Sequence, residues 1–102
     1  MRIFLACNDR DLVPIYTKYI WEMGAQCTTE EPDHCDALFL GAGWQKDRVC
    51  VVTKGYFSTK YPTRPIFFDI PTLRDWVWHE RERRSLEDFR TTKQGEQTEL
   101  PL

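Results

Sequence analysis

The amino-acid sequence predicts a small three-layer α/β domain built on a short parallel sheet. Three observations predict it: strand segments alternate with helical segments, the main strand segments are continuously apolar, and the chain has only 102 residues. Strands that alternate with helices form parallel sheets with right-handed crossovers, and continuously apolar strands are buried on both faces. This length suits one domain, which we expect over residues 1–90, followed by a polar, disordered tail over 91–102.

Three strong strands are predicted from short apolar runs, which cover residues 3–7, 35–40 and 65–70. A weaker strand is predicted over residues 25–29. It is short and polar, which favours a position at the edge of the sheet. The first, second and third strong strands are therefore the expected centre of the fold.

The clearest predicted helix follows the first strand and ends at Gly24. Asp11 is its expected N-cap, which puts Pro14 in the first turn, where a missing N–H costs nothing. A glycine after the last turn fits a left-handed C-cap. Six apolar residues at helical spacing are expected to face the core: Leu12, Ile15, Tyr16, Tyr19, Ile20 and Met23.

Residues 45–60 carry two competing signals. A run of β-branched residues over 49–52 favours a strand, whereas Val49, Val52 and Tyr56 also form a helical stripe. We favour the helix, with Asp47 near its start.

A last helix is predicted to begin at Thr72. This residue is a good N-cap, and Asp75 stands three residues on, as in a capping box. Leu73, Trp76 and Val77 are expected to face the core. Trp76 and Trp78 are two residues apart and cannot share a helix face, so at least one is expected to be exposed or to pack against a second copy.

Composition narrows the classes of function. The net charge of −2 lacks the basic excess of a dedicated nucleic-acid binder, and no apolar stretch approaches a membrane span. The first residues lack the apolar run of a signal peptide, so we expect a cytoplasmic protein without a disulfide framework. Cys27, His34 and Cys35 lack the paired spacing of a zinc site, so neither a metal nor a cofactor is expected.

The candidate site follows from the predicted sheet, because ligands of such sheets bind beyond the carboxyl ends of the strands. Two loops reach that edge, over residues 7–11 and 41–48. Glycines there permit close approach of a ligand, Trp44 can stack on a base or sugar or cover the core, and Arg10 can bind phosphate or lie in a solvated turn. The candidate ligand-binding residues are Cys7, Asn8, Arg10, Gly41, Gly43, Trp44 and Arg48.

Asp47 and Arg48 each have two interpretations. They fit a helix cap and a solvated base, and they fit groups that hold a sugar hydroxyl and a phosphate. The sequence leaves both interpretations open.

Four segments carry a family resemblance: Arg2-Ile-Phe-Leu-Ala, the first helix ending at Gly24, Cys35-Asp-Ala-Leu-Phe-Leu-Gly-Ala-Gly-Trp44, and Pro65-Ile-Phe-Phe68. With these segments the chain resembles the nucleoside 2-deoxyribosyltransferase-like superfamily, and it looks closest to the small bacterial and phage domains related to those enzymes. The resemblance covers roughly residues 2 to 70. It implies a flavodoxin-like, Rossmann-like fold and a pocket for a nucleoside or nucleotide.

The resemblance also implies a helix over residues 47–59. In the enzymes this helix carries Ser-x-Gly-x-x-x-Glu, and the Glu attacks the anomeric carbon of the sugar. Here Asp47, Val49 and Thr53 stand at the Ser, Gly and Glu positions. Thr is a poor nucleophile without an activating base. The resemblance therefore implies a binding domain that lacks the catalytic Glu.

Two alternatives remain open. One is a small protein-interaction module, for example a phage factor acting on a host protein, or a homodimer formed through exposed tryptophans. The other is an active nucleoside N-glycosidase or deoxyribosyltransferase that takes its carboxylate from Asp36 or Asp47.

Overall fold

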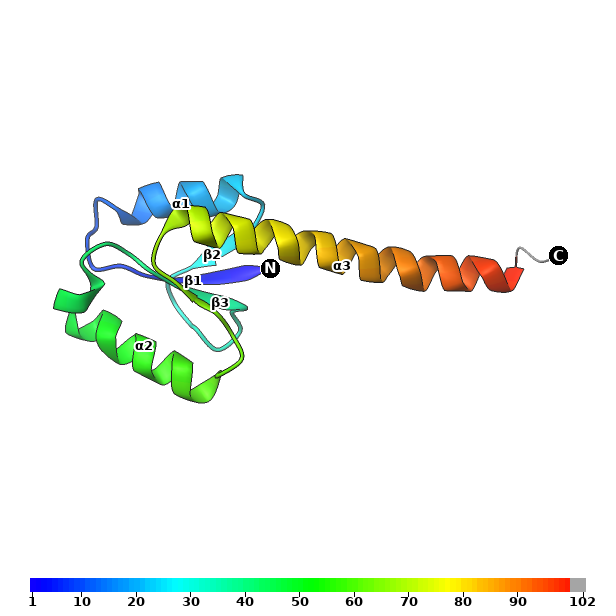
Figure 1. Ribbon diagram of the computed structural model, residues 1–102. Coiled ribbons are helices and arrows are strands. Elements are labelled where there is room, and N and C mark those ends of the chain that lie inside the picture. Colours follow the sequence, from blue (N-terminus) through cyan, green and yellow to red (C-terminus); the bar gives the residue numbers. More distant parts are fainter. Residues whose placement is uncertain (100–102) are drawn as a thin grey trace.

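A computed structural model describes the backbone of residues 1–99 and the side chains of residues 1–87. Four parallel strands form one sheet in the order β2-β1-β3-β4. Three helices pack on it, so the predicted three-layer α/β fold is confirmed, with a flavodoxin-like or Rossmann-like arrangement (Figure 1). The strands are β1 (Arg2–Ala6), β2 (Gln26–Thr28), β3 (Ala37–Leu40) and β4 (Ile66–Phe67).

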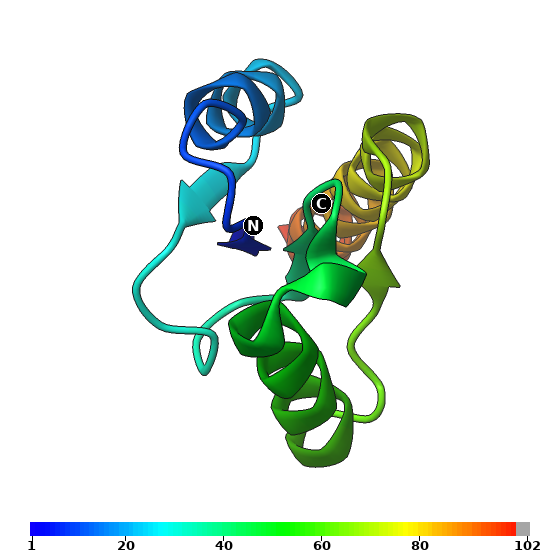
Figure 2. The same cartoon turned by 90° about the vertical axis from the view of Figure 1, so that its left-hand side faces the viewer.

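The helices divide between the two faces of the sheet. Helices α1 (Val13–Glu22) and α3 (Ile70–Glu99) lie side by side on one face, and α2 (Arg48–Lys60) covers the other (Figures 1 and 2). No helix in residues 1–99 is both long enough and apolar enough to cross a membrane.

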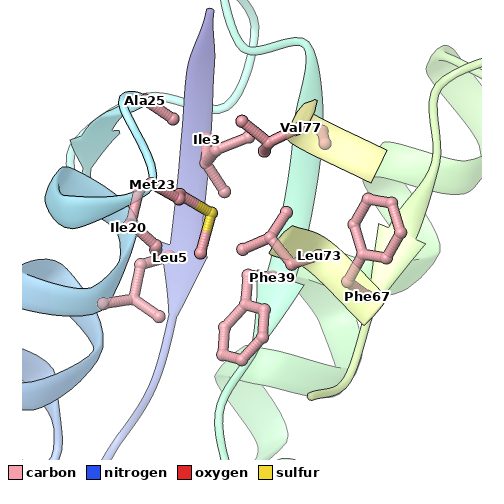
Figure 3. Packing of buried hydrophobic residues seen from close by; sticks show 10 residues of the cluster. Ile3, Leu5, Ile20, Met23, Ala25, Phe39, Phe67, Leu73 and Val77 are labelled. Atoms are coloured by element: carbon pink, nitrogen blue, oxygen red, sulfur yellow. The ribbon is translucent and has the colours of Figure 1, made fainter. Parts of the chain in front are cut away.

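Each face of the sheet has its own core, because alternate strand residues point to opposite faces. Figure 3 shows the core beneath α1 and α3, where Ile3 and Leu5 of β1 meet residues of both helices. The labelled members are Ile3, Leu5, Ile20, Met23, Ala25, Phe39, Phe67, Leu73 and Val77. The core beneath α2 consists of Phe4, Ala6, Cys35, Leu38, Leu40, Cys50 and Phe57.

Helix α1 ends as predicted but begins differently. Gly24 has a φ of +90°, and the amide of Gly24 donates to the Trp21 carbonyl at 3.0 Å. The expected N-cap at Asp11 is wrong: Leu12 occupies that position, without a side-chain cap. The preceding loop is instead organised by Asp9, whose carboxylate accepts from the Asp11 amide at 2.9 Å.

The predicted apolar stripe of α1 is wrong at two of its six residues. Tyr16, Ile20 and Met23 face the core, but Ile15 and Tyr19 are 47% and 48% exposed. Val13, which was not in the predicted stripe, packs against the core in their place. Residues 13, 16, 20 and 23 also have helical spacing, so periodicity alone did not choose between the two stripes.

The helical interpretation of residues 45–60 is confirmed, and Asp47 caps α2 by accepting from the Cys50 amide at 3.1 Å. The predicted stripe on this helix is wrong, however. Val49 and Val52 are 70% and 61% exposed, whereas Cys50 and Phe57 are buried. The buried pair belongs to the same core as Phe4 of β1 and Leu38 of β3.

Strand β4 is shorter than expected, because Ile70 already belongs to α3. Asp69, not Thr72, caps this helix: its Oδ1 accepts from the Thr72 amide at 2.9 Å and from the Thr72 hydroxyl at 2.8 Å. The expected core residues Leu73 and Val77 are fully buried.

Helix α3 continues beyond the sheet as a projecting segment (Figure 1). Its backbone is helical to Glu99. The expected change from domain to tail at residue 91 stays a prediction, because the side chains after Glu87 and the whole of residues 100–102 lie outside the described part of the chain.

Candidate functional site

A cavity of about 300 Å³ opens at the carboxyl edge of the sheet. It lies between the end of β1, the residue that follows β2 and the amino-terminal half of α2. The lining residues are Phe4, Leu5, Ala6, Cys7, Asn8, Val13, Thr29, Asp47, Val49, Cys50 and Thr53. The cavity therefore occupies the edge at which ligands of parallel α/β sheets bind.

The connection between β2 and β3 explains why there is space here. Residues 29–36 join these parallel strands without an α-helix, so α2 is the one described helix on that face (Figure 2). Phe4 and Ala6 of β1 point toward α2 and form the floor. A small polar residue, Thr29, stands where the chain leaves β2.

Polar side chains from three elements meet at this cavity. Asn8, Thr29 and Thr53 make no side-chain hydrogen bond with any described residue. Oδ2 of Asp47 accepts from the Cys50 amide at 3.1 Å, and the Asp47 carboxylate also interacts with the Cys50 thiol. Asn8, Thr29 and Thr53 can therefore bind a ligand without first breaking a side-chain hydrogen bond within the described chain.

The two cysteines of the cavity differ in their surroundings. Burial and the neighbouring Asp47 carboxylate raise the pKa of the Cys50 thiol to about 12. A neutral thiol is a weak nucleophile, so Cys50 contributes a small apolar wall. Cys7 is half-buried, and its thiol donates to the Asp9 carbonyl at 3.6 Å. All four cysteines of the chain are free.

The structure brings three of the sequence-predicted residues together: Cys7, Asn8 and Asp47 all line the cavity. Arg10 and Arg48 lie nearby in sequence but are exposed and do not line it. No lysine or arginine is among the described residues of the lining.

The two predicted glycines, Gly41 and Gly43, have structural roles outside the cavity. A Cβ on Gly41 would lie 2.6 Å from Cys7 Sγ and 3.0 Å from Tyr16 Cε2, so this glycine lets the loop pack against its neighbours. Gly43 has a φ of +80° and precedes a short 3₁₀ turn, η1 (Trp44–Lys46). Neither glycine lines the cavity.

Trp44 packs against residues outside the cavity. Its ring stacks on Phe68 at 5.5 Å between centroids, and Lys54 Nζ lies 5.6 Å from the indole. The tryptophan is half-buried beside β4 and is not part of the cavity wall.

Asp36 lies at the opposite, amino edge of the sheet. Its Oδ2 accepts from the Arg2 amide at 2.8 Å, and its Oδ1 pairs with Arg84 at 3.3 Å. Burial works against its ionisation, but the contacts with Arg2 and Arg84 lower its pKa overall. Of the two candidate carboxylates, only Asp47 reaches the cavity.

Sequence reasoning did not include Thr29 among the site residues, and it named Val49 and Thr53 only as positions of the resembled motif and not as ligand-binding residues. Thr29 follows β2, whose carboxyl end lies at the same edge as that of β1. Val49 and Thr53 are four residues apart and therefore share one side of α2, the side that faces the cavity together with the N-cap residue Asp47. The position of Thr29 after a strand and the four-residue spacing of Val49 and Thr53 can be read from the sequence. Which side of α2 faces the cavity is known only from the structure.

The described residues contain no group of three or more His, Cys, Asp or Glu side chains that could hold a metal ion. Comparisons with family models, with curated proteins and with solved structures gave no match for this chain.

Proposed function

We propose that this protein binds a nucleoside-type ligand in the cavity between β1, β2 and α2. One observation carries the proposal: Asp47, Val49 and Thr53 line the same cavity. These are the three positions that align with Ser, Gly and Glu of the resembled enzymes, in which the Glu meets the sugar of the substrate. Residues chosen from that resemblance thus converge on one concave site at the edge where such folds bind ligands.

The chemistry of the lining suits a sugar and a base. The Asp47 carboxylate can accept from a ribose or deoxyribose hydroxyl, and Asn8 can donate to and accept from the edge of a base. Apolar groups from Phe4, Ala6 and Val49 provide walls for the ring systems.

The charge of the lining favours a nucleoside over a nucleotide. Asp47 is the charged residue of the wall, and it also occupies the amino terminus of α2, where a phosphate would otherwise bind. Arg10 and Arg48 lie outside the lining. A phosphate in this cavity would meet a carboxylate without a compensating cation.

Binding, rather than glycosyl transfer, is the activity that these groups support best. Thr53 stands at the nucleophile position and has no described base as hydrogen-bond partner. The Cys50 thiol is neutral over the physiological range.

Calorimetry with matched nucleosides and nucleoside monophosphates tests the proposal. We expect heat with at least one nucleoside and binding at least tenfold weaker for its monophosphate. Thr53→Val should weaken nucleoside binding several-fold, whereas Thr59→Val, an exposed threonine on the same helix, should leave it unchanged. No heat with any nucleoside, or equal effects of the two substitutions, would contradict the proposal.

N-glycoside hydrolysis is the second candidate function, and the specific observation for it is that Asp47 places a carboxylate in the wall of the cavity. Incubation with deoxynucleosides followed by chromatography for free base tests it. Release of base that disappears in Asp47→Asn would favour this candidate over simple binding.

A further inference from the structure

The outer surface of the α1 and α3 layer carries an apolar patch with one acid and one base. We define the α1/α3 surface as Ile15, Tyr19 and Glu22 of α1 with Ile70, Arg74 and Trp78 of α3. Tyr19 is 48% and Trp78 54% exposed. This surface lies on the face of the domain opposite α2, away from the nucleoside-type cavity (Figures 1 and 2).

A groove runs along this surface between the two helices. Its volume is about 230 Å³, and its walls include Tyr19, Glu22, Arg74 and Trp78. Arg74 lies over the Trp78 ring, with 5.4 Å from the guanidinium carbon to the ring centroid. The exposed aromatics therefore flank a concave site that can accept a large side chain from outside.

The two charged residues of the surface, Glu22 and Arg74, differ in whether they have an ionic partner. Glu22 on α1 is paired with the exposed Lys18 on its own helix, at 3.9 Å. Arg74 on α3 pairs with no carboxylate of the described residues. One side of the groove thus presents an acid, and the other side presents a base that lacks an ionic partner in the described chain.

We infer that this surface binds a second copy of the same chain, in a two-fold symmetric dimer. A two-fold axis along the groove lays α1 of one copy over α3 of the other. It thereby brings the α1 side of each copy, with Tyr19 and Glu22, against the α3 side of its partner, with Arg74 and Trp78 (Figure 1). A surface with an acid on one side of such an axis and a base on the other is complementary to itself.

The exposed aromatic area supplies only part of the surface that a stable interface buries. Two half-exposed aromatic side chains leave roughly 150–250 Å² uncovered. A stable dimer buries roughly 800 Å² per partner, so the contact must extend along the outer sides of both helices. The dimer is therefore expected to dissociate on dilution rather than to be permanent.

Sedimentation of the full chain over a range of concentrations tests the inference. The wild-type protein should pass from monomer to dimer as its concentration rises. Trp78→Gln should weaken the dimer at least tenfold, because exposed aromatics at the centre of an interface dominate its energy. Val52→Gln is the control: Val52 is 61% exposed on α2, which covers the opposite face of the sheet (Figure 1), so the dimer should persist.

A charge exchange identifies the partner residues. Glu22→Arg and Arg74→Glu should each remove the dimer, because each places like charges opposite one another. An equimolar mixture of the two variants should form a heterodimer, in which every pair is again opposite in sign. Pairing within one chain cannot produce this recovery.

Two results would overturn the inference. One is a wild-type chain that stays monomeric at high micromolar concentration, which would leave the surface to a different partner. The other is a dimer that Trp78→Gln leaves intact while circular dichroism shows an unchanged fold, which would place the interface elsewhere.

Discussion

The two edges of the sheet differ in whether their polar side chains are hydrogen-bonded within the protein. At the amino edge, the side chains of Asp33, Asp36 and Arg64, which lie before β3 and β4, are hydrogen-bonded within the protein. At the carboxyl edge, Asn8, Thr29 and Thr53 make no side-chain hydrogen bond with described residues. Polar groups that are satisfied within the protein stabilise it, whereas unsatisfied groups around a cavity are available to a ligand.

Asp33 is the centre of the amino edge. Its Oδ1 accepts from the Tyr56 and Tyr61 hydroxyls, both at 2.7 Å, and from Lys60 at 3.4 Å. Arg64 donates to the Asp33 carbonyl at 3.1 Å and joins this loop to the chain before β4. The edge is thus held by bonds between segments that are far apart in sequence.

Helix α2 takes part in both edges. Its carboxyl-terminal half is anchored by Phe57, which is fully buried and packs on Tyr61 at 5.4 Å between ring centroids. Its amino-terminal half supplies Asp47, Val49 and Thr53 to the cavity. Helix α2 therefore has a carboxyl-terminal half that is held by core packing and an amino-terminal half that is available to a ligand.

The largest effect is expected from Phe57→Ala at the fixed end. Loss of a fully buried phenyl ring should lower the free energy of unfolding by about 3–5 kcal/mol. Thr53→Ala, one turn earlier on the cavity side, should cost less than about 1 kcal/mol. Urea unfolding of both variants measures the difference, and similar losses would show that the two halves of α2 do not differ as argued.

Gly41→Ala is expected to have the next largest effect. Its new Cβ would meet Cys7 Sγ at 2.6 Å, and such overpacking costs about 1–3 kcal/mol. Gly55→Ala is the control, because nothing lies within 4 Å of the added Cβ and alanine favours a helix by about 1 kcal/mol. Opposite shifts in the unfolding midpoint are expected; a shift of the same sign in both would refute the packing argument.

Asp47 separates stability from binding at the carboxyl edge. Asp47→Ala should cost about 1 kcal/mol through loss of the α2 cap, while Asp47→Asn retains a cap of similar quality. Asp47→Asn should nevertheless weaken nucleoside binding about tenfold or more, because a bond to a charged group is lost. Calorimetry and thermal unfolding of both variants check this; unchanged binding in Asp47→Asn would remove Asp47 from the site.

The smallest effect is expected in acid. The hydroxyls of Tyr61 and Tyr56 hold the pKa of Asp33 at about 2, below its ordinary value. A carboxyl with a lowered folded-state pKa stabilises the protein fully above about pH 4, and this contribution is lost as the pH falls toward 2. Tyr61→Phe should shift that loss to higher pH, as measured by urea unfolding between pH 2 and 5. Identical acid profiles for the variant and the wild type would contradict this role of Tyr61.

Much of the fold was predictable from local sequence. The alternation of apolar runs with helical segments predicted the parallel sheet, and Gly24 predicted the end of α1 because its left-handed φ suits glycine. A cap at Asp47 was one of two interpretations left open by the sequence, and the structure shows that its side chain accepts from the amide three residues ahead. Each of these features depends on residues that are close in sequence.

The site was predictable only in part. Cys7, Asn8 and Asp47 follow from strand ends and from the cap. Thr29 comes from a third segment, and Thr53 depends on how α2 is rotated. Gly41 and Trp44 are adjacent to this edge, but packing against Tyr16 and Phe68 directs them away from the cavity.

The sequence by itself determined the parallel sheet and the end of α1 at Gly24, and it left the cap at Asp47 as one of two interpretations. The tertiary structure decided which stripe of α1 and α2 is buried, and hence that Thr53 faces the cavity while Tyr19 faces outward. The physical reason is that apolar spacing establishes a helix but not its rotation when two stripes are available. The shape of the sheet surface, with Phe4 and Leu38 on one face and Ile3 and Phe39 on the other, makes that choice.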